Sequence, residues 1–482
     1  MTKFYFLGIG GTAMASVAGA FAKLGHSVTG SDSGVYPPMS DFLREAGISY
    51  FETYSEQYLI TAAPDIIVVG NAISRGNPEL EYALDQRLSF ISMTEAVRSE
   101  LIRQNTSVVI TGTHGKTTTT SVASWLLESG GLTPGFLIGG IPENFGYGCR
   151  PAKIPNGHKY GFFVTEGDEY DTAFFDKRSK FLHYRPDIAV INNIEFDHAD
   201  IFSSLAEIEL SFRRFVNLIP RSGVLLINNE DAVAKRVSEK SFAPVQTFGL
   251  NGNAFWQATE IEYGSDKTSF SVLREGKLVG RFSSPLFGEH NCRNVLATIA
   301  VATHAGLSPE HIQTGLSSFK SPKRRLEVLG EFDGITLIDD FAHHPTAIHE
   351  TLKAVRQKYP ERRMVVCFEP RSNTTTRNIF QKELAGCFEL AGVVAIGPIS
   401  RPERYALSER LDTRKLVSDL EAKGKIAYAT PVPAPAAYVR EIADFVCKQV
   451  KADDVILLLS NGNFGGLATE LRQRFSASKT GN

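Results

Sequence analysis

The sequence predicts an α/β protein of three domains, each built on an open and mostly parallel sheet. The chain has 482 residues, and at roughly 100–200 residues per domain this length fits about three domains. Glycine-rich turns follow apolar, strand-like runs near residues 8 and 112, which is typical of strand–turn–helix units. Further apolar runs end in polar residues, as parallel strands do when their carboxyl ends carry a site.

The composition is that of an ordinary globular protein. Hydrophobic residues make up 43% and charged residues 22%, with 51 basic and 53 acidic side chains and a net charge of -2. This balance gives no electrostatic reason for nucleic-acid binding. No apolar run is long enough to span a membrane, and the start of the chain is too short for a signal peptide. The five scattered cysteines argue against a disulfide framework. We therefore expect a cytoplasmic monomer or weak homodimer with no membrane or nucleic-acid partner.

The first domain, expected over residues 1–105, opens as a β-α-β unit. Residues 3–9 form a β-rich run, 12–24 carry small and apolar residues at helical spacing, and 26–32 make the second strand. A further buried strand is expected at 64–70. This order predicts a Rossmann-like domain.

The loop of this unit fits a dinucleotide-binding pattern. Gly8-Ile9-Gly10-Gly11-Thr12-Ala13 follows the first strand, and Asp32 comes roughly twenty residues later. By itself the pattern suggests NAD, but such a loop holds any diphosphate at a helix N-terminus. A diphosphate-linked substrate is at least as good an interpretation, and a tight turn without a ligand remains a third.

The second domain, expected over 106–320, starts with a phosphate-binding loop. The strand 107–111 runs into glycine-rich residues, and a helix is expected over about 117–128. Lys116 supplies a cation for phosphate oxygens and the Thr117 hydroxyl can reach Mg²⁺. The loop is shorter than the standard motif, because Gly112 lies only three residues before Gly115. The candidate ATP-binding residues of this loop are Gly112, Thr113, His114, Gly115, Lys116, Thr117 and Thr118.

Acidic clusters follow two later strands of the same domain. The strand 161–165 ends at Glu166, with Asp168 and Glu169 just beyond it, and 187–192 is followed by a run that ends in His198. Parallel strands end at the same sheet edge, so these groups should lie near the phosphate loop. Mg²⁺ prefers oxygen ligands. We expect Thr117, Glu166 and His198 to bind Mg²⁺, the alternative being solvated loop charges.

The rest of the chain completes the second domain and forms a third. Strands are expected at 223–228 and an antiparallel edge within 253–283, followed by a helix at about 292–305. A polar, proline-containing break at 321–325 separates a Rossmann-like third domain, 321–482. Its expected strands are 335–340, 364–368 and 454–460.

These motifs together resemble those of the Mur ligase family, over nearly the whole chain. The family consists of ATP-dependent, amide-forming enzymes of peptidoglycan synthesis with three α/β domains. Besides the two glycine loops and the acidic clusters, the resemblance rests on His290-Asn291 with Asn294, Arg324-Arg325, and Asp339-Asp340-Phe341-Ala342-His343-His344-Pro345.

Within the family, the chain looks like the branch that uses UDP-N-acetylmuramate. Residues 173–181 and 369–374 resemble enzymes that join this nucleotide to the murein tripeptide L-alanyl-γ-D-glutamyl-meso-diaminopimelate in cell-wall recycling. Ser460-Asn461-Gly462 also resembles that group. Gly167 departs from the family pattern, since relatives usually carry Ala there.

The resemblance implies a role for each of these motifs. Asn291 and Asn294 would contact adenine, and Arg325 and Asp340 would reach phosphate and ribose. Thr117 with Glu166 would hold one Mg²⁺, and Glu166 with His198 a second. The UDP part would bind Gly8, Gly10, Gly11, Thr12, Asp32 and Asn71, while His343, His344, Arg371 and Asn373 would face the peptide.

The implied reaction proceeds through an acyl phosphate, and substrates gripped by three domains imply hinges near residues 105 and 320. His343 or His344 is a candidate base for the acceptor amine, although a buried structural histidine is the commoner case. The polar run 176–180 is either a tripeptide contact or a solvated loop.

Three other functions stay open at this point. The first is an L-alanine-adding ligase of the same family, which free L-alanine as acceptor would reveal. The second is an NAD-dependent oxidoreductase built on the first loop, and the third is a non-catalytic nucleotide switch. ATP-dependent phosphate release that requires the substrates would exclude both of these.

Overall fold

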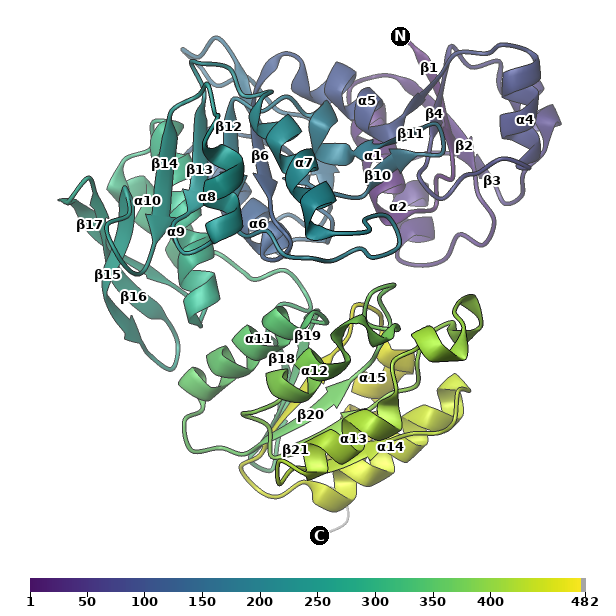
Figure 1. The fold of residues 1–482 in the computed structure, drawn as a ribbon. Helices are drawn as coiled ribbons and strands as arrows, with labels where there is room; N and C mark the ends of the chain where they lie inside the picture. Colours follow the sequence, from purple (N-terminus) through teal and green to yellow (C-terminus); the bar gives the residue numbers. More distant parts are fainter. Residues whose placement is uncertain (478–482) are drawn as a thin grey trace.

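The computed structural model describes residues 1–477, which form three lobes, each built on its own main sheet (Figure 1). The N-terminal lobe spans 3–102 and carries five parallel strands in the order β3-β2-β1-β4-β5. The strands are β1 Lys3–Leu7, β2 Ser27–Ser31, β3 Tyr50–Phe51, β4 Ile66–Val69 and β5 Phe90–Ser92. The helices are α1 Thr12–Lys23, α2 Met39–Glu45, α3 Glu56–Ala62, α4 Pro78–Asp85, α5 Met93–Val97 and the π-helix η1 Arg98–Ile102.

The central lobe, 105–317, carries a ten-stranded sheet in the order β17-β16-β15-β14-β13-β12-β6-β9-β7-β8. Its middle strands are parallel, while β15, β16 and β17 form the expected antiparallel edge. The strands are β6 Asn105–Thr111, β7 Gly135–Leu137, β8 Cys149–Arg150, β9 Gly161–Gly167, β12 Ile188–Ile191, β13 Val224–Asn228, β14 Val245–Gly249, β15 Trp256–Tyr263, β16 Thr268–Arg274 and β17 Lys277–Ser284. The helices are α6 Lys116–Ser129, α7 Leu205–Val216, α8 Ala232–Ser238, α9 Glu289–His304 and α10 Pro309–Ser317.

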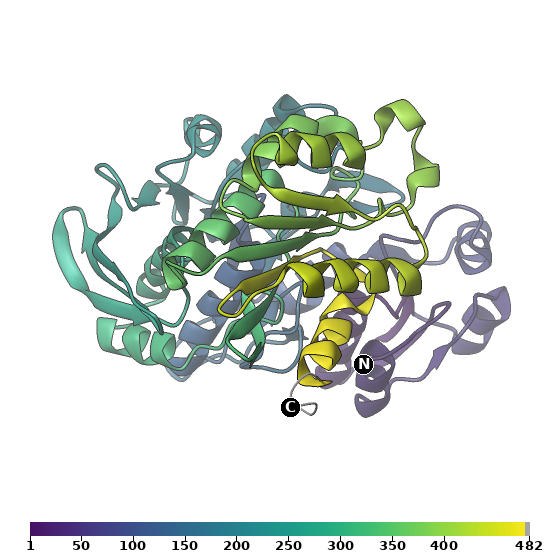
Figure 2. The same ribbon diagram turned by 90° about the horizontal axis from the view of Figure 1, so that it is seen from below.

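The C-terminal lobe, 327–477, has a six-stranded sheet in the order β18-β19-β23-β20-β21-β22, parallel except for β18. The strands are β18 Glu327–Phe332, β19 Ile335–Asp340, β20 Met364–Phe368, β21 Val393–Ile396, β22 Ile426–Ala429 and β23 Val455–Leu459. The helices are α11 Pro345–Lys358, α12 Gln381–Cys387, α13 Thr413–Glu421, α14 Pro435–Gln449 and α15 Leu467–Ala477. Viewed from below, this lobe lies across the other two (Figure 2).

This architecture confirms the predicted α/β class with a Rossmann-like N-terminal lobe, a central phosphate-loop lobe and a Rossmann-like C-terminal lobe. The boundaries proposed at 105 and 320 stay predictions. Among residues 1–477, no helix has the length and apolar character that crossing a bilayer requires.

The N-terminal and central lobes share one apolar core. A single cluster of buried side chains includes Phe21 and Val97 of the first lobe together with Phe181, Phe212 and Phe215 of the second. The C-terminal lobe instead has its own clusters on the two faces of its sheet. Opening near residue 105 would expose much of the shared core to water, which is costly. The packing therefore does not support the hinge expected near residue 105. It is compatible with the hinge expected near residue 320, which stays a prediction.

A β-hairpin also ties the first two lobes together. Its strands are β10 Asp171–Ala173 and β11 Asp176–Ser179, so most of the run 176–180 is a strand and not a loop. At the hairpin tip, Phe174 packs against the core of the N-terminal lobe. Its ring centroid lies 6.4 Å from that of Phe90, and Phe175 lies 5.2 Å from the same ring.

The shared core predicts that the first two lobes unfold together. Phe181 is fully buried against Phe212 and Phe215, and it lies in η2 (Lys180–His183), which contacts α5. Phe181→Ala should lower the free energy of unfolding by about 3–5 kcal/mol in urea denaturation. Hydrogen exchange should then show faster opening in both 3–102 and 105–317.

The matched control is Phe242→Ala, because Phe242 is 66% exposed in the same lobe. Its effect should stay within about 0.5 kcal/mol. Opening of residues 3–102 in a step separate from the central lobe would contradict the shared core.

Candidate active site

The phosphate loop joins the end of β6 to the start of α6. Gly112 and Gly115 both have positive φ values, +135° and +81°, which glycine adopts without steric cost. A Cβ atom on Gly115 would lie 2.7 Å from Asn294 Oδ1, and one on Gly112 would lie 3.0 Å from the backbone of Asn193. The loop is thus packed between α9 and the segment after β12, so both glycines are needed for space as well as for conformation.

The strand register brings the predicted groups to one sheet edge. Thr111 of β6 pairs with Ile191 of β12 on one side and with Gly167 of β9 on the other. The acidic runs after β9 and β12 therefore flank the phosphate loop, as their positions in the sequence predict. A Cβ atom on Gly167 would lie 2.4 Å from Thr111 Cγ2, which explains why this chain carries glycine there.

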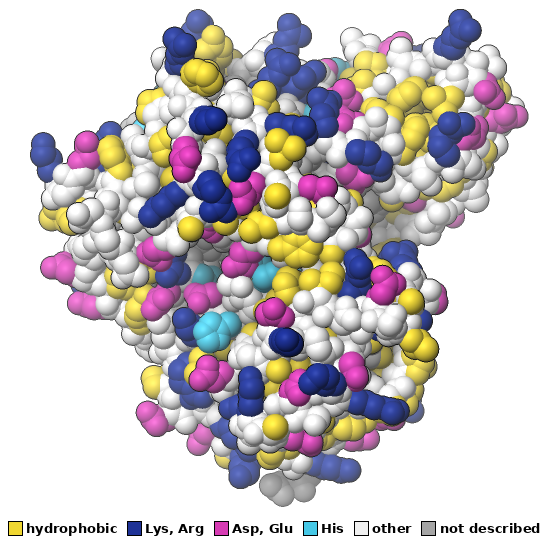
Figure 3. Space-filling model, viewed as in Figure 1, with side chains coloured by type: hydrophobic (Ala, Val, Ile, Leu, Met, Phe, Trp, Pro, Cys, Tyr) yellow, Lys and Arg dark blue, Asp and Glu magenta, His cyan; other side chains and the backbone are white. Residues whose placement is uncertain are grey.

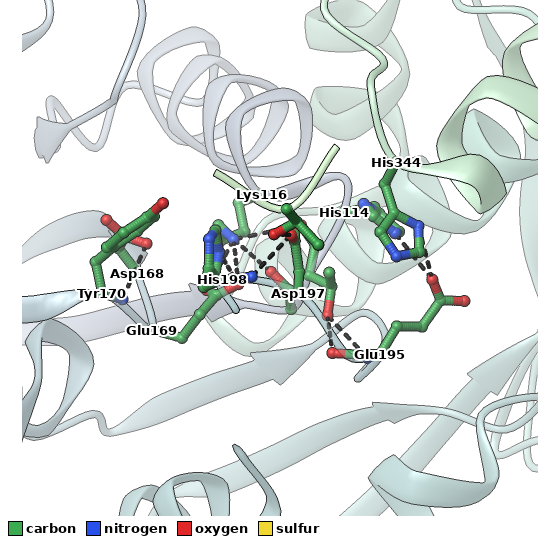
Figure 4. A network of polar contacts seen from close by, with 12 residues as sticks. His114, Lys116, Asp168, Glu169, Tyr170, Glu195, Asp197, His198 and His344 are labelled. Carbon is green, nitrogen blue, oxygen red and sulfur yellow. Dashed lines mark hydrogen bonds and ion pairs between the residues drawn. The ribbon is translucent and has the colours of Figure 1, made fainter. Parts of the chain in front are cut away.

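Lys116 and Glu169 form a buried ion pair at the centre of the site (Figure 4). Lys116 Nζ donates to Glu169 Oε2 at 2.8 Å and to the Gly112 carbonyl at 2.6 Å. The side chains are 15% and 3% exposed. Burial alone would lower the pKa of Lys116, but the carboxylates of Glu169 and Asp168 raise it above its usual value. Lys116 is therefore held as a cation.

His198 is held by the same carboxylate. Its Nε2 lies 3.0 Å from Glu169 Oε1, and its ring lies 4.1 Å from that of Tyr170. Burial would lower the pKa of His198, but Glu169 raises it. Asp168 in turn accepts a hydrogen bond from Lys180 Nζ at 3.0 Å. Lys116 and His198 thus share the carboxylate of Glu169 in a network from which bulk water is largely excluded.

Glu166 lies at the other side of Lys116, against the start of α6. Its Oε1 accepts from the Gly139 N–H at 2.7 Å and its Oε2 from the Thr117 hydroxyl at 3.2 Å. Burial raises the pKa of Glu166 even though Arg325 lies nearby, so its negative charge is only partly offset. A buried carboxylate and a hydroxyl are oxygen donors of the kind that Mg²⁺ prefers. These residues therefore fit the predicted ion.

The structure gives His198 partners other than Glu166. The possible ligand atoms of Asp168, Glu169 and His198 lie within 4.8 Å of one another, and Glu166 is not in that group. The sequence places Asp168 and Glu169 next to the chosen Glu166, yet only the packing shows that Glu169 faces both Lys116 and His198. The assignment of Glu166 and His198 to metal stays a prediction.

The predicted nucleotide residues from other elements also reach the loop. Asn294 lies beside Gly115 and donates to Asn291 Oδ1 at 3.2 Å, and Arg325 Nη2 donates to the Thr117 hydroxyl at 3.0 Å. Asp340, by contrast, accepts hydrogen bonds from the backbone N–H groups of residues 326 and 342, both at 2.8 Å. Its carboxylate therefore orders the linker into the C-terminal lobe.

The predicted UDP residues lie around the first glycine loop. Asp32 Oδ2 accepts from the Gly10 N–H at 2.7 Å, and its Oδ1 accepts from the Tyr54 hydroxyl at 2.8 Å. Gly8, Gly11 and Thr12 complete the turn into α1. Asn71 follows β4, the neighbour of β1, and donates to Asp171 of the β10–β11 hairpin at 3.4 Å. Tyr54 was not selected from the sequence, because nothing near it marks it as a partner of Asp32.

Polar side chains make part of the contact between the C-terminal and central lobes, and Phe287 of the central lobe adds an apolar contact with the C-terminal core. Asn373 Nδ2 donates to Asp200 Oδ2 at 2.8 Å, and the Thr374 hydroxyl donates to Asp197 Oδ1 at 2.7 Å. Histidine and acidic side chains gather where the lower lobe meets the upper ones (Figure 3). Water can replace such polar contacts, whereas it cannot replace the apolar contacts of the shared core.

The four predicted acceptor residues occupy different positions in this region. His344 lies at the interface, and its Nε2 lies 3.2 Å from the Phe196 carbonyl. His343 Nδ1 lies 3.0 Å from the Phe341 carbonyl. The Arg371 side chain is 40% exposed, with its Nη1 3.6 Å from Glu369 Oε1, and Asn373 donates to Asp200 as described above.

Comparison with known proteins gives three consecutive family matches. The model described as "Mur ligase family, catalytic domain" matches residues 3–105, "Mur ligase middle domain" matches 110–302, and "Mur ligase, glutamate ligase domain" matches 324–462. Together they match well over half of the chain.

Individual relatives match over nearly their whole length. The UDP-N-acetylmuramate–L-alanyl-γ-D-glutamyl-meso-2,6-diaminoheptandioate ligase of Haemophilus influenzae is 40% identical, covering 97% of this chain and 98% of the relative. The UDP-N-acetylmuramate–L-alanine ligase of Endomicrobium trichonymphae is 33% identical, with 97% of each chain covered. The crystal structure of a murein peptide ligase from Psychrobacter arcticus is 33% identical with a TM-score of 0.71, covering 98% of this chain and 99% of that one.

The Lys116–Glu169 pair predicts a large effect of Glu169→Gln. The substitution removes the charge that compensates Lys116 and His198, and leaves both in a buried site. Urea denaturation should show a loss of about 3 kcal/mol or more. Glu262→Gln is the matched control, because Glu262 is 71% exposed in its pair with Arg281 and its change should cost less than about 1 kcal/mol. Equal effects of the two substitutions would refute the structural importance of the buried pair.

Proposed function

The chain belongs to the Mur ligase family, and from this premise we propose that it joins UDP-N-acetylmuramate to the tripeptide L-alanyl-γ-D-glutamyl-meso-diaminopimelate. It is an ATP-dependent ligase that forms an amide bond and releases ADP and phosphate. The observation that carries the reaction is the buried cation of Lys116 at the phosphate loop, faced by the carboxylates of Glu166, Asp168 and Glu169 at the end of β9. The choice of tripeptide over L-alanine is supported by 40% identity to the tripeptide ligase against 33% to the alanine ligase.

A carboxylate is a poor acylating agent, so the ligase activates it with ATP. An oxygen of the lactyl carboxylate attacks the γ-phosphorus, and ADP leaves. The acceptor amine then attacks the carbonyl carbon of the acyl phosphate, loses a proton and expels phosphate. Each turnover therefore makes one amide bond and converts ATP to ADP and phosphate.

The central lobe supplies the charge for phosphoryl transfer. Lys116 would exchange the Gly112 carbonyl, now 2.6 Å away, for oxygens of the transferring group. Thr117 with Glu166 would hold one Mg²⁺ and Glu166 with His198 a second, and these ions neutralise negative charge when bound. Before the nucleotide binds, Glu169 holds Lys116 and His198 next to each other.

The remaining nucleotide contacts are proposed from the positions of side chains around the phosphate loop. Asn291 and Asn294 would bind adenine beside Gly115, and Arg325 would reach phosphate from its place on Thr117. Asp340 would reach the ribose. In the N-terminal lobe, the UDP part would lie on the first glycine loop. The residues proposed for it are Gly8, Gly10, Gly11, Thr12, Asp32 and Asn71.

Arg371 is the proposed contact for an acidic peptide. Its guanidinium lies against Gly462, where a Cβ atom would come within 2.3 Å of Arg371 Nε. Ser460 beside it is tied to Glu369 by a hydrogen bond. Glycine at 462 therefore makes room for Arg371, and a guanidinium fork is suited to a carboxylate. This supports a peptide acceptor with free carboxylates.

The acceptor assay tests the proposal directly. Purified protein is incubated with ATP, Mg²⁺, UDP-N-acetylmuramate and either the tripeptide or free L-alanine, and phosphate and amide are measured. We expect substrate-dependent phosphate release with the tripeptide and at least about 100-fold less with L-alanine, because the buried polar groups of a peptide site would stay unpaired. Strong turnover with L-alanine and none with tripeptide would identify the alanine ligase instead.

His343 is the better of the two candidate bases. Its Nδ1 faces the Phe341 carbonyl and must carry the ring proton, so Nε2 keeps a free lone pair. Burial lowers the pKa of His343, which leaves the ring neutral at pH 7. His344 has both nitrogens engaged, with Nε2 at the Phe196 carbonyl and Nδ1 accepting from the Thr346 N–H at 3.3 Å. We therefore propose His343 as the group that takes the proton of the amine.

His343→Ala should lower kcat by about 100-fold or more at pH 7. The loss should shrink as the pH rises from 7 to 9, because an α-amino group with a pKa of about 8 then becomes neutral unaided. The check is the pH profile of kcat with tripeptide. His349→Ala, also near the start of α11, is the control that should leave the profile unchanged. A profile for His343→Ala that runs parallel to that of the unmodified protein would exclude His343 as base.

The proposed setting is the cytoplasm, with a monomer or weak homodimer as the working state. Four of the cysteines are buried and Cys447 is exposed, and all five are free, which suits a reducing compartment.

A further inference from the structure

We infer that His114, Glu195 and His344 form a site for a divalent transition metal of the zinc class, which links the central and C-terminal lobes. The possible ligand atoms of these three residues all lie within 4.8 Å of one another. Glu195 Oε2 lies 3.0 Å from His114 Nε2 and 3.3 Å from His344 Nδ1. This group lies apart from Glu169 and His198 in the same region (Figure 4).

The two sides of the site come from different lobes. His114 belongs to the phosphate loop and Glu195 to the segment after β12, both in the central lobe. His344 precedes α11 in the C-terminal lobe. Its side chain is 6% exposed, against 20% for His114 and 32% for Glu195, so the ligands are largely shielded from water.

The hydrogen bonds around His344 set its tautomer. Nε2 faces the Phe196 carbonyl and must donate to it. Burial lowers the pKa of His344 well below its usual value, so the ring is neutral and Nδ1 carries a lone pair. That lone pair faces Glu195 Oε2 at 3.3 Å. Two acceptors at this distance repel each other unless a cation lies between them.

The helix-capping role of His344 does not remove this conflict. The Thr346 N–H donates to Nδ1 at 3.3 Å, a long bond that explains the position of the ring at α11. It supplies no positive charge towards Glu195. A metal ion at this point would accept electron pairs from Nδ1, from Glu195 and from His114 Nε2, with the ring proton of His114 moved to Nδ1.

The donor set decides the class of ion. Two imidazoles and one carboxylate suit Zn²⁺, Co²⁺ or Ni²⁺, and zinc sites of this composition keep a fourth position for water. Mg²⁺ prefers oxygen ligands and fits Thr117 and Glu166 better. The backbone carbonyl behind His344 is the outer-shell partner that such sites usually have.

Because His344 arrives only with the C-terminal lobe, the ion would bind the closed arrangement in preference to the open one. A ligand of this kind shifts the population towards the closed form. The zinc-class ion would therefore hold the lobes together and slow the opening that releases product. This inference does not depend on which acceptor the ligase uses.

The test titrates Co²⁺ into the full chain in the presence of excess Mg²⁺ and follows visible absorption. One equivalent should give the intense bands of four-coordinate Co²⁺ bound by nitrogen. His344→Ala and Glu195→Gln should each weaken this binding by about 100-fold or more, since even outer-shell changes cost 10–100-fold. Circular dichroism checks that each variant is folded. If His344→Ala does not fold, Glu195→Gln still tests the site.

Two control variants locate the signal. His198→Ala removes the only imidazole of the neighbouring group, and His158→Ala removes an exposed histidine. Both should keep the absorption. Loss of the bands in His198→Ala, or their persistence in both His344→Ala and Glu195→Gln, would overturn the site.

Small-angle scattering tests the link between lobes. Zn²⁺ with excess Mg²⁺ should reduce the radius of gyration of the unmodified chain and leave that of Glu195→Gln unchanged. An unchanged radius in the unmodified chain, despite bound metal, would show that the ion does not hold the lobes together.

Discussion

The buried ion pair between Lys116 and Glu169 is the contact around which the site is organised. A buried charge is costly unless it is paired, so the start of α6 and the segment after β9 must stay in register. Glu169 also holds His198, which brings the segment after β12 into the same network. Three parallel strands therefore deliver one cation, one histidine and several carboxylates to a single edge. Any shift of β9 against β6 would leave Lys116 without its partner.

The lobes are joined by two different kinds of interface. The N-terminal and central lobes are joined by a continuous apolar core and by Phe174 of the hairpin, so separating them would expose apolar surface to water. The C-terminal lobe contacts them through polar pairs such as Thr374–Asp197 and Asn373–Asp200, and through Phe287 of the central lobe, which packs against the C-terminal core. Water can replace these pairs, so we expect any opening to move the lobe that carries the proposed base and peptide contacts. The phosphate loop lies where the fixed and movable parts meet.

Much of this could be predicted from the sequence because the signals are local. The two glycine loops, the strand ends at Glu166 and His198 and the three sheets follow from short patterns with a direct physical meaning. Long-range packing could not be predicted in this way. Nothing local marks Glu169 rather than Glu166 as the partner of Lys116, pairs Tyr54 with Asp32, or shows that Glu195 faces two histidines. The packing that argues against the hinge expected near residue 105 is not visible locally for the same reason, since the shared core depends on side chains from distant segments.

The central claim is that the carboxylate of UDP-N-acetylmuramate is activated by the phosphate of ATP at Lys116. Transfer of ¹⁸O tests it most directly. With both lactyl carboxylate oxygens labelled, one labelled oxygen should appear in each phosphate released during amide formation, because the carboxylate oxygen that attacks phosphorus leaves with it. Mass spectrometry of the phosphate gives the answer. Amide formation that releases phosphate without ¹⁸O would contradict an acyl-phosphate route, and with it the role assigned to the site.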